Sequence, residues 1–344
     1  MVHFRPLEPW KDPRGGQIER IRIDNGIIAL EVLSLGGIIR SLWTPNREGE
    51  RGNIVLGCDS AEDYLAQDAH LGAIVGRYAN RVANGQMSFG NEHHQLDVNQ
   101  LNHCLHGGSE GFNRKHWLIG QLPDGVRLSL ASPDGDMGFP GNCNIQLDYR
   151  LTGNNLYMEI FASTDKPCPI NLTQHSYFNL ESGQSVLNRD HWLQINSATY
   201  LPLDELGLPT GVSDVKGTNL DFNRMKAFAS AQDDPAFSAT SGIDHCYLTG
   251  AKDTELTHFG SLSAPKSGRR MTLYTNQPSV QIYGTNFLGG QKGRNGQHLN
   301  KHQAICMEPQ QIPDGPNQTE LISNPWIKPD QVYHHISRYQ FETF

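Results

Sequence analysis

The chain has 344 residues, enough for two domains or one large all-β domain, and it can bury a substantial core without disulfide bridges. Its 28 Lys and Arg against 36 Asp and Glu give a formal charge of −8, which argues against binding to nucleic-acid phosphates. Only 37% of the residues are hydrophobic and no apolar run is long enough to span a bilayer, so an integral membrane protein is excluded.

The N-terminal residues contain no apolar core of the kind found in secretory signals, so we expect a cytoplasmic protein. The cysteines stand far apart and form no C-x-x-C pair, which predicts reduced thiols rather than a disulfide framework or a zinc cluster. They are Cys58, Cys104, Cys143, Cys168, Cys246 and Cys306.

Short alternating or β-branched stretches predict strands along most of the chain, and turn dipeptides such as Asn25-Gly26 and Asp124-Gly125 separate them. The expected strands are 27–33, 125–131, 144–151, 156–162, 271–275 and 280–283. Two segments favour helix instead. Ser60 and Asp63 form a capping-box pattern that opens a helix over 61–67, and 222–231 is a weaker candidate.

The predicted strands do not alternate regularly with long helices, so a parallel sheet built from βαβ units is not expected. The sequence shows no internal repeat, no low-complexity tract and no linker that would separate two domains. With 35 glycines and 19 prolines, the composition also suits a turn-rich β architecture. We therefore predict one large antiparallel β-sandwich with few short helices, a single domain over residues 1–344.

The first segment that could carry chemistry is 170–180. If this segment is a strand, the apolar residues Ile170 and Leu172 share one face. The opposite face carries the polar residues Asn171, Thr173, His175 and Tyr177. Such a row suits a hydroxyl-rich ligand, and His175 could transfer a proton near neutral pH. The alternative is a satisfied polar face of the sandwich.

A second candidate is the carboxylate of Glu308. An apolar strand runs directly into it, and Pro309 holds its backbone extended. A carboxylate at the end of a buried strand is partly desolvated, which raises its pKa toward the range useful to a general base. The alternative is a strand-end glutamate that pairs with a nearby arginine or caps a turn.

Two further segments contribute weaker candidates. Arg77 and Arg81 lie in a low-charge stretch, where an arginine fork could hold hydroxyls or carboxylates, although surface arginines are more common. His106 precedes two glycines, where the backbone can approach a ligand closely. His103 and Cys104 raise a metal alternative, but no second pair with zinc-ligand spacing follows.

The common nucleophile, dinucleotide and zinc-protease motifs are missing from the chain. An acid–base reaction without a cofactor therefore fits the residue inventory better than hydride, phosphoryl or acyl transfer.

Seven strings, in order along most of the chain, together resemble the aldose 1-epimerase (mutarotase) family. The strings are Gly76-Arg-Tyr-Ala-Asn-Arg-Val-Ala-Asn-Gly85, Leu105-His-Gly-Gly108, Ser132-Pro-Asp-Gly-Asp-Met-Gly-Phe-Pro-Gly-Asn142, Asn171-Leu-Thr-Gln-His-Ser-Tyr-Phe-Asn-Leu180, Ile243-Asp-His245, Gln277-Pro-Ser-Val-Gln-Ile-Tyr283, and Glu308-Pro-Gln with Pro313-Asp. The resemblance implies the galactose mutarotase-like supersandwich. It also implies interconversion of the α- and β-anomers of free hexoses such as glucose and galactose, as part of hexose metabolism.

Carried over to this chain, the resemblance makes Glu308 the general base and His175 the acid. The sugar-contacting positions that it implies are Asn80, Arg81, His106, Tyr177, Asp244 and Gln281. It implies a monosaccharide substrate and no metal or other cofactor. Charge and hydropathy predict no nucleic-acid or membrane partner, and the oligomeric state stays open between a monomer and a homodimer. Interconversion of anomers by ring opening needs a base for the C1 hydroxyl and an acid for the ring oxygen. We therefore predict that Glu308 and His175 face one another across a gap the size of a monosaccharide.

The chain departs from the family pattern at three positions. Gln174 stands where asparagine is usual before the acid, and Cys104 is atypical before the Leu-His-Gly-Gly string. Ile312 stands where an aromatic residue is common, which bears on ring stacking and sugar preference. None of these changes removes a residue that would transfer a proton.

Two rival functions compete with the epimerase. A non-catalytic carbohydrate-binding module would keep the hydroxyl-binding face without needing a base. An epimerase of phosphorylated hexoses would need a cluster of arginine or lysine at the pocket rim.

Overall fold

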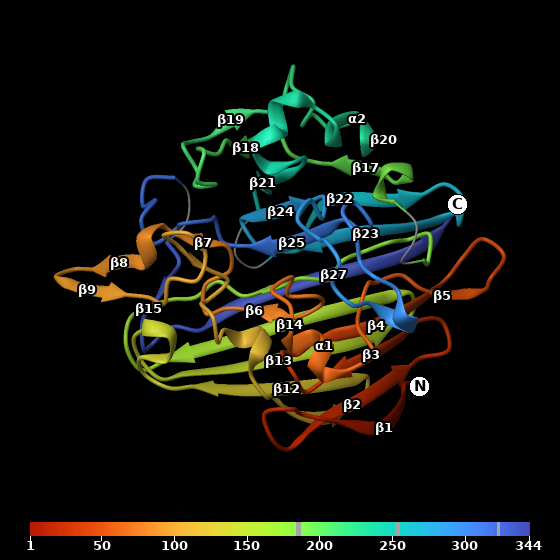
Figure 1. Ribbon diagram of the computed structural model, residues 1–344, viewed down its shortest axis with the longest axis horizontal. Helices are drawn as coiled ribbons and strands as arrows, with labels where there is room; N and C mark the ends of the chain where they lie inside the picture. Colours follow the sequence, from red (N-terminus) through yellow and green to blue (C-terminus); the bar gives the residue numbers. More distant parts are fainter. Residues whose placement is uncertain (184–186, 252–254, 322–323) are drawn as a thin grey trace.

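The structure, a computed structural model, describes residues 1–183, 187–251, 255–321 and 324–344. Within these residues the largest element is a nine-stranded antiparallel sheet that forms the long central band of the molecule (Figure 1). In sheet order its strands are β11 (Leu118–Leu122), β12 (Gly125–Ser132), β13 (Cys143–Thr152), β14 (Asn155–Thr164), β27 (Tyr333–Thr343), β23 (Arg269–Thr275), β22 (Thr257–Ala264), β17 (Trp192–Ile195) and β20 (Lys226–Ala227). The C-terminal strand β27 thus joins two blocks of neighbouring strands into one sheet.

Two five-stranded antiparallel sheets accompany the large sheet in the described part of the chain. The N-terminal sheet contains β1 (His3–Lys11), β2 (Gln17–Asp24), β3 (Ala29–Leu33), β4 (Ile39–Pro45) and β5 (Arg51–Asn53). The other contains, in sheet order, β19 (Ser213–Asp214), β18 (Thr199–Leu201), β21 (Asp244–Leu248), β24 (Ser279–Tyr283) and β25 (Cys306–Gln310). We call this second sheet the site sheet.

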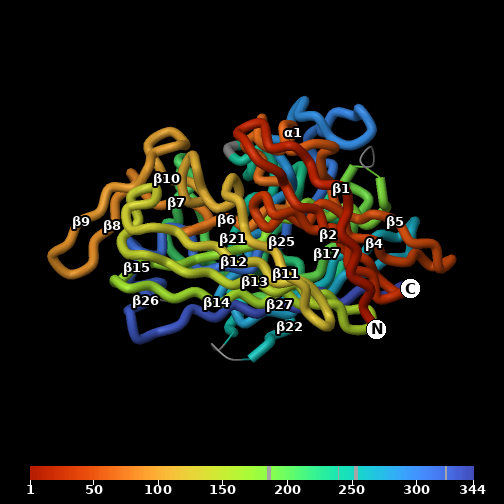
Figure 2. The backbone as a smooth tube through the Cα atoms, turned by 90° about the horizontal axis from the view of Figure 1, so that it is seen from below, coloured from red at the N-terminus to blue at the C-terminus, as the bar shows by residue number. Residues whose placement is uncertain are grey.

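Short elements complete the described fold. Four antiparallel strand pairs are β6 (Ile74–Val75) with β16 (Thr173–Gln174), β7 (Arg81–Val82) with β10 (Cys104–Leu105), β8 (Gln86–Phe89) with β9 (Glu92–Gln95), and β15 (Cys168–Pro169) with β26 (Trp326–Ile327). The α-helices are α1 (Ala61–Leu65) and α2 (Ala229–Gln232). Neither described α-helix is long and apolar enough to cross a membrane. Both termini lie at the end of the molecule opposite the β8–β9 hairpin (Figure 2).

All six stretches predicted as strands coincide with β3, β12, β13, β14, β23 and β24, with ends shifted by up to two residues. Side-chain alternation explains this agreement. Leu128, Leu147 and Ile160 pair across three neighbouring strands and are all fully buried. One cluster of buried apolar side chains also includes Leu30 from the N-terminal sheet and Val280 from the site sheet, so the three sheets share a core. The all-β prediction is confirmed, and the single domain over 1–344 stays a prediction.

The helix predictions are partly right. The helix after Ser60 exists as α1, and the Ser60 hydroxyl accepts a hydrogen bond from the Asp63 amide, as the capping pattern predicts. The helix predicted over 222–231 is wrong for most of its length. Phe222 and Phe228 bury their rings 6.4 Å apart, and strand β20 lies between them.

The prediction of one strand over 170–180 is also wrong, because β16 is the one regular strand described within it, and Asn171 and Phe178 form isolated bridges. The whole segment is buried, so its residues do not divide into a core face and an outer face. Its polar groups bond instead to surrounding backbone. Asn171 donates to the Ala79 carbonyl, and Gln174 donates to the Gly72 carbonyl. Alternation of apolar and polar residues identifies a strand only when one of its faces is exposed, and this segment is buried on both sides.

Arg77 is a fully structural residue, 2% exposed. Its guanidinium donates to the hydroxyl and carbonyl of Ser132 and to the carbonyls of Pro133, Pro140 and Gly141, at 2.7–3.0 Å. The side chain therefore fastens the segment that carries Arg81 to the connection between β12 and β13.

We expect Arg77→Lys to lower the free energy of unfolding by about 2–4 kcal/mol, because an ammonium group cannot span acceptors placed for a planar fork. Guanidinium chloride denaturation would measure the change. The matched control is Arg81→Lys, four positions along, which should change stability by less than about 0.5 kcal/mol. Equal unfolding midpoints for Arg77→Lys and the wild type would contradict this account.

Candidate active site

Three strands of the site sheet place acidic and amide side chains together. Glu308 on β25 is paired in register with Gln281 on β24, so both project from the same face of the sheet. Asp244 is on β21, the next strand. The Gln281 amide donates to Asp244 Oδ1 at 2.6 Å, whereas Gln281 Oε1 has no partner among the described residues. Gln281 thus keeps a free acceptor next to a fixed carboxylate.

His175 is held by its backbone and by a stacked ring. Its amide donates to the Ala73 carbonyl, and its own carbonyl accepts from the Gly72 amide. The Tyr177 ring stacks on its imidazole at 5.1 Å between centroids, and the Tyr177 hydroxyl donates to the Ala69 carbonyl. These contacts fix the imidazole without using its ring nitrogens as anchors.

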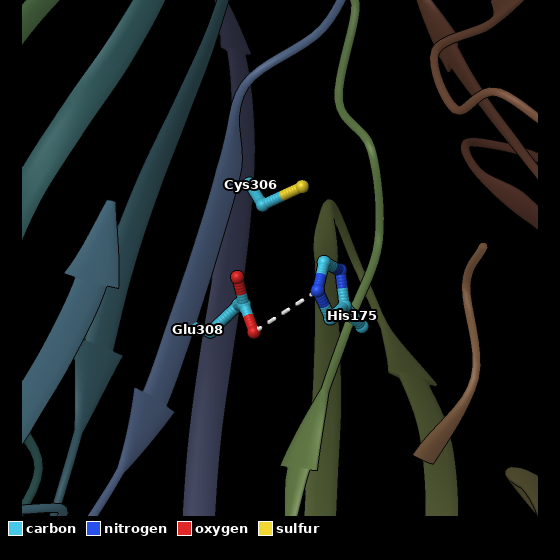
Figure 3. Close-up of side chains that lie close together, drawn as sticks. All are labelled: His175, Cys306 and Glu308. Carbon is cyan, nitrogen blue, oxygen red and sulfur yellow. Dashed lines mark ion pairs between the residues drawn. The ribbon is translucent and has the colours of Figure 1, made fainter. Parts of the chain in front are cut away.

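The imidazole of His175 and the carboxylate of Glu308 point toward one another from different segments (Figure 3). His175 Nε2 and Glu308 Oε2 are 3.5 Å apart, and the two side chains are only 6% and 3% exposed. The predicted sugar-sized gap between them is therefore wrong. The C1 hydroxyl and the ring oxygen of an aldose are bonded to the same carbon, so a base and an acid in direct contact can reach both from one edge of the sugar.

Two loops exchange hydrogen bonds at another wall of the site. The Asn80 amide donates to His106 Nδ1, and the His106 amide donates to the Asn80 carbonyl, both at 3.1 Å. Because Nδ1 accepts, neutral His106 carries its proton on Nε2. Arg81 is anchored nearby by a hydrogen bond from its Nε to Gln100 Oε1 at 2.9 Å.

A cavity of about 430 Å³ collects these groups. All eight residues predicted for the site line it, namely Asn80, Arg81, His106, His175, Tyr177, Asp244, Gln281 and Glu308. Their individual roles stay predictions.

Several lining residues were not predicted from the sequence. His70 packs its ring 4.7 Å from His106 and 6.1 Å from His175, and no motif marked it. Gln100 and Tyr283 also line the cavity. Tyr283 ends one of the matching strings two residues after Gln281, so strand alternation could have identified it.

Other candidates lie elsewhere. Asn171 and Thr173 are not among the lining residues, so the predicted polar row contributes only His175 and Tyr177. Arg77 points away into its ring of carbonyls. His103 accepts a hydrogen bond from the Asn84 amide. In the described parts of the chain the potential metal ligands gather at His175, Cys306 and Glu308 instead.

Burial governs the charges in the cavity. It lowers the pKa of His175 and raises the pKa of Glu308, and neighbouring Asp244 raises the latter further. Burial also raises the pKa of Asp244, although the positive charge of Arg81 opposes this. These shifts favour the distribution in which neither member of the Glu308–His175 pair is charged.

The family model described as "Aldose 1-epimerase" matches residues 19–340, and the chain belongs to this family. Galactose mutarotase of Homo sapiens is 35% identical over 331 residues, 95% of each chain. Aldose 1-epimerase of Escherichia coli strain K12 is 37% identical over 325 residues, which are 92% of this chain and 93% of the relative.

Solved structures show the same fold. Galactose 1-epimerase from Lactobacillus acidophilus NCFM superposes with a TM-score of 0.84 at 28% identity and covers 100% of this chain and 99% of its own. A GalM/aldose epimerase homologue from C. elegans gives a TM-score of 0.85 at 24% identity, with coverage of 100% and 99%. The predicted mutarotase-like supersandwich is thereby confirmed.

We expect His106 to stay neutral, with its proton on Nε2, when the pH falls below 6.5. Burial lowers the pKa of His106, and neighbouring His70 lowers it further. The unfolded chain binds this proton first, so the contribution of His106 to stability declines as the pH drops below 6.5. Two-bond ¹H–¹⁵N NMR spectra would report tautomer and charge, with free imidazole as the reference. A proton on Nδ1, or titration at 6.5, would contradict the geometry.

Proposed function

We propose that this protein is an aldose 1-epimerase that interconverts the α- and β-anomers of free hexoses such as glucose and galactose. The observation that carries the proposal is the direct contact of Glu308 with His175 in a cavity whose remaining walls are rich in hydrogen-bonding groups. Relatives named galactose mutarotase and aldose 1-epimerase, at 35% and 37% identity, support the same activity. A cytoplasmic location and a monomeric or dimeric state stay predictions.

Anomerisation requires the bond between C1 and the ring oxygen to open and to reclose on the other face. Glu308 takes the proton of the C1 hydroxyl while protonated His175 gives a proton to the ring oxygen. The free aldehyde then turns about the C1–C2 bond. On closure the two residues exchange roles, and the pair ends with the proton count with which it began.

Sugar binding prepares the pair for this step. The mechanism requires the Glu308–His175 pair to hold one proton, and the opposite pKa shifts of the two groups favour that proton on Glu308 before a sugar binds. A C1 hydroxyl that donates to Glu308 stabilises the carboxylate, and a ring oxygen that accepts from His175 stabilises the imidazolium. The two groups are 3.5 Å apart, so a small approach brings them within hydrogen-bond reach and lets the proton pass between them.

The remaining polar residues hold the part of the sugar that does not react. Arg81 and His106 offer N–H donors, whereas Asp244 and the free oxygen of Gln281 offer acceptors. Tyr177 keeps the imidazole of His175 in place by stacking. Because the other hydroxyls of the sugar are held by these residues, only the aldehyde at C1 turns while the ring is open.

The rival functions fit the cavity less well. A non-catalytic sugar-binding module has no use for a buried carboxylate in contact with a buried imidazole, because desolvating such a pair costs stability. A phosphohexose epimerase would need several cations for the phosphate. Among the described lining residues Arg81 is the sole arginine or lysine, and Arg77 is turned away.

We expect Glu308→Gln and His175→Asn each to slow the enzymatic conversion about 10²–10⁴-fold, since each removes one positioned proton transfer. Polarimetry of freshly dissolved α-galactose and α-glucose would follow the rate, and circular dichroism would confirm folding. Glu159 and His334 form a matched glutamate–histidine contact at 3.0 Å on β14 and β27, and neither lines the cavity. Glu159→Gln and His334→Asn should keep wild-type rates. Full activity in both site variants would reject the assignment.

We also expect kcat/KM to follow a bell-shaped pH profile, because the pair must hold one proton. Burial lowers the pKa of His175, so uptake of a second proton should reduce activity only below pH 6.5. Burial and Asp244 raise the pKa of Glu308, so loss of the shared proton should occur well above pH 4.5. Rates measured across the pH range would contradict this account if the acid limb began at or above 6.5.

A further inference from the structure

Next to the proposed proton-transfer pair lies a thiol that the mechanism does not use. Cys306 and Glu308 are two residues apart on β25, so their side chains project from the same face of the strand. Figure 3 shows the thiol and the carboxylate together beside the imidazole of His175. One ligand atom from each of the three residues lies within 4.8 Å of the other two.

We propose that His175, Cys306 and Glu308 form an inhibitory binding site for a thiophilic divalent cation such as Zn²⁺. The three residues offer imidazole nitrogen, sulfur and carboxylate oxygen, the donor types that bind Zn²⁺ in proteins. Hard cations such as Mg²⁺ and Ca²⁺ prefer sites made of oxygen alone and should not compete.

The spacing is close to that of a tetrahedral site. Zinc–ligand distances of about 2.0–2.3 Å place neighbouring ligand atoms about 3.4–3.6 Å apart. His175 Nε2 and Glu308 Oε2 are already 3.5 Å apart. The ligand atom of Cys306 lies within 4.8 Å of those of His175 and Glu308, so a tetrahedral site requires the sulfur to move closer to both.

Burial and access both suit a bound cation. Cys306, Glu308 and His175 are 0%, 2% and 5% exposed, so water would compete weakly for a cation held between them. His175 Nδ1 has no hydrogen-bond partner among the described residues, so coordination of the ring breaks no hydrogen bond at that nitrogen. His175 and Glu308 line the cavity, so a cation can enter by the route that a sugar uses. Three protein ligands leave a fourth position for water.

Binding would block the reaction for a simple reason. The cation takes the lone pairs of Glu308 and His175 that would otherwise move protons, and coordination by Cys306 releases the thiol proton to water. No oxidant or reductant takes part. This inhibition rests on the proposed function, whereas cation binding itself does not.

Co²⁺ is the probe for the site, because its visible spectrum reports tetrahedral coordination and a thiolate ligand directly. The wild-type protein, freed of metals, should develop a thiolate-to-cobalt charge-transfer band that Zn²⁺ abolishes by displacement. Cys306→Ser should lose the band and weaken Co²⁺ binding by more than about 100-fold, since even the loss of outer-shell partners costs about 10–100-fold. Glu308→Gln should also weaken binding.

The matched control is Cys246→Ser. Cys246 is an equally buried thiol on β21, next to the strand of Gln281, and it is not part of the ligand cluster. This variant should keep the cobalt band. In polarimetric assays, Zn²⁺ at saturation should slow the wild type and Cys246→Ser at least about 100-fold, the loss expected when acid–base catalysis stops. Cys306→Ser should stay active at the same Zn²⁺ concentration, and Mg²⁺ should inhibit none of the proteins.

The outcomes separate the two proposals. Absence of the cobalt band in the wild type, or its survival in Cys306→Ser, would overturn the metal site. A band in an active wild type that Zn²⁺ fails to inhibit would overturn the inhibitory role. A wild type that binds Co²⁺ but never accelerates anomerisation would overturn the proposed enzymatic function and leave the site intact.

Discussion

The contact between Glu308 and His175 is the interaction on which the proposed chemistry depends. Both side chains are almost fully buried. Burial disfavours the charged form of each, so it lowers the pKa of His175 and raises the pKa of Glu308. A pair that shares one proton can be neutral when the cavity is empty and charged when a sugar supplies matching hydrogen bonds. The energetic cost of burying two ionisable groups is thereby limited to the bound state.

The fold supplies this contact from two kinds of structure. Glu308, Gln281 and Asp244 come from adjacent strands of the site sheet, whose register fixes their spacing. His175 comes from an irregular segment, which the backbone of Ala73 and the ring of Tyr177 hold in place. A rigid sheet opposite a well-anchored loop keeps the catalytic groups in position.

Much of the fold could be predicted from the sequence, because half-buried strands such as β12 and β14 keep a visible alternation of apolar and polar residues. The segment 170–180 could not, since it is buried on both sides and its polar groups bond to backbone from distant parts of the chain. The eight site residues followed from matching strings, but their spacing did not. Asp244 and Glu308 are 64 positions apart and come together because β24 pairs with both of their strands, an arrangement that leaves no local signal. The same holds for the opposite fates of Arg77 and Arg81.

The reciprocal hydrogen bonds between Asn80 and His106 have a consequence for how this family can diversify. The ring and the backbone amide of His106 both bond to the backbone of Asn80 across 26 positions of sequence, so His106 ties the two loops together at the cavity. A replacement of His106 therefore removes a sugar-facing group and also the bond from the Asn80 amide, next to Arg81 in the chain. A new sugar preference that replaces His106 should therefore need a compensating substitution near Asn80.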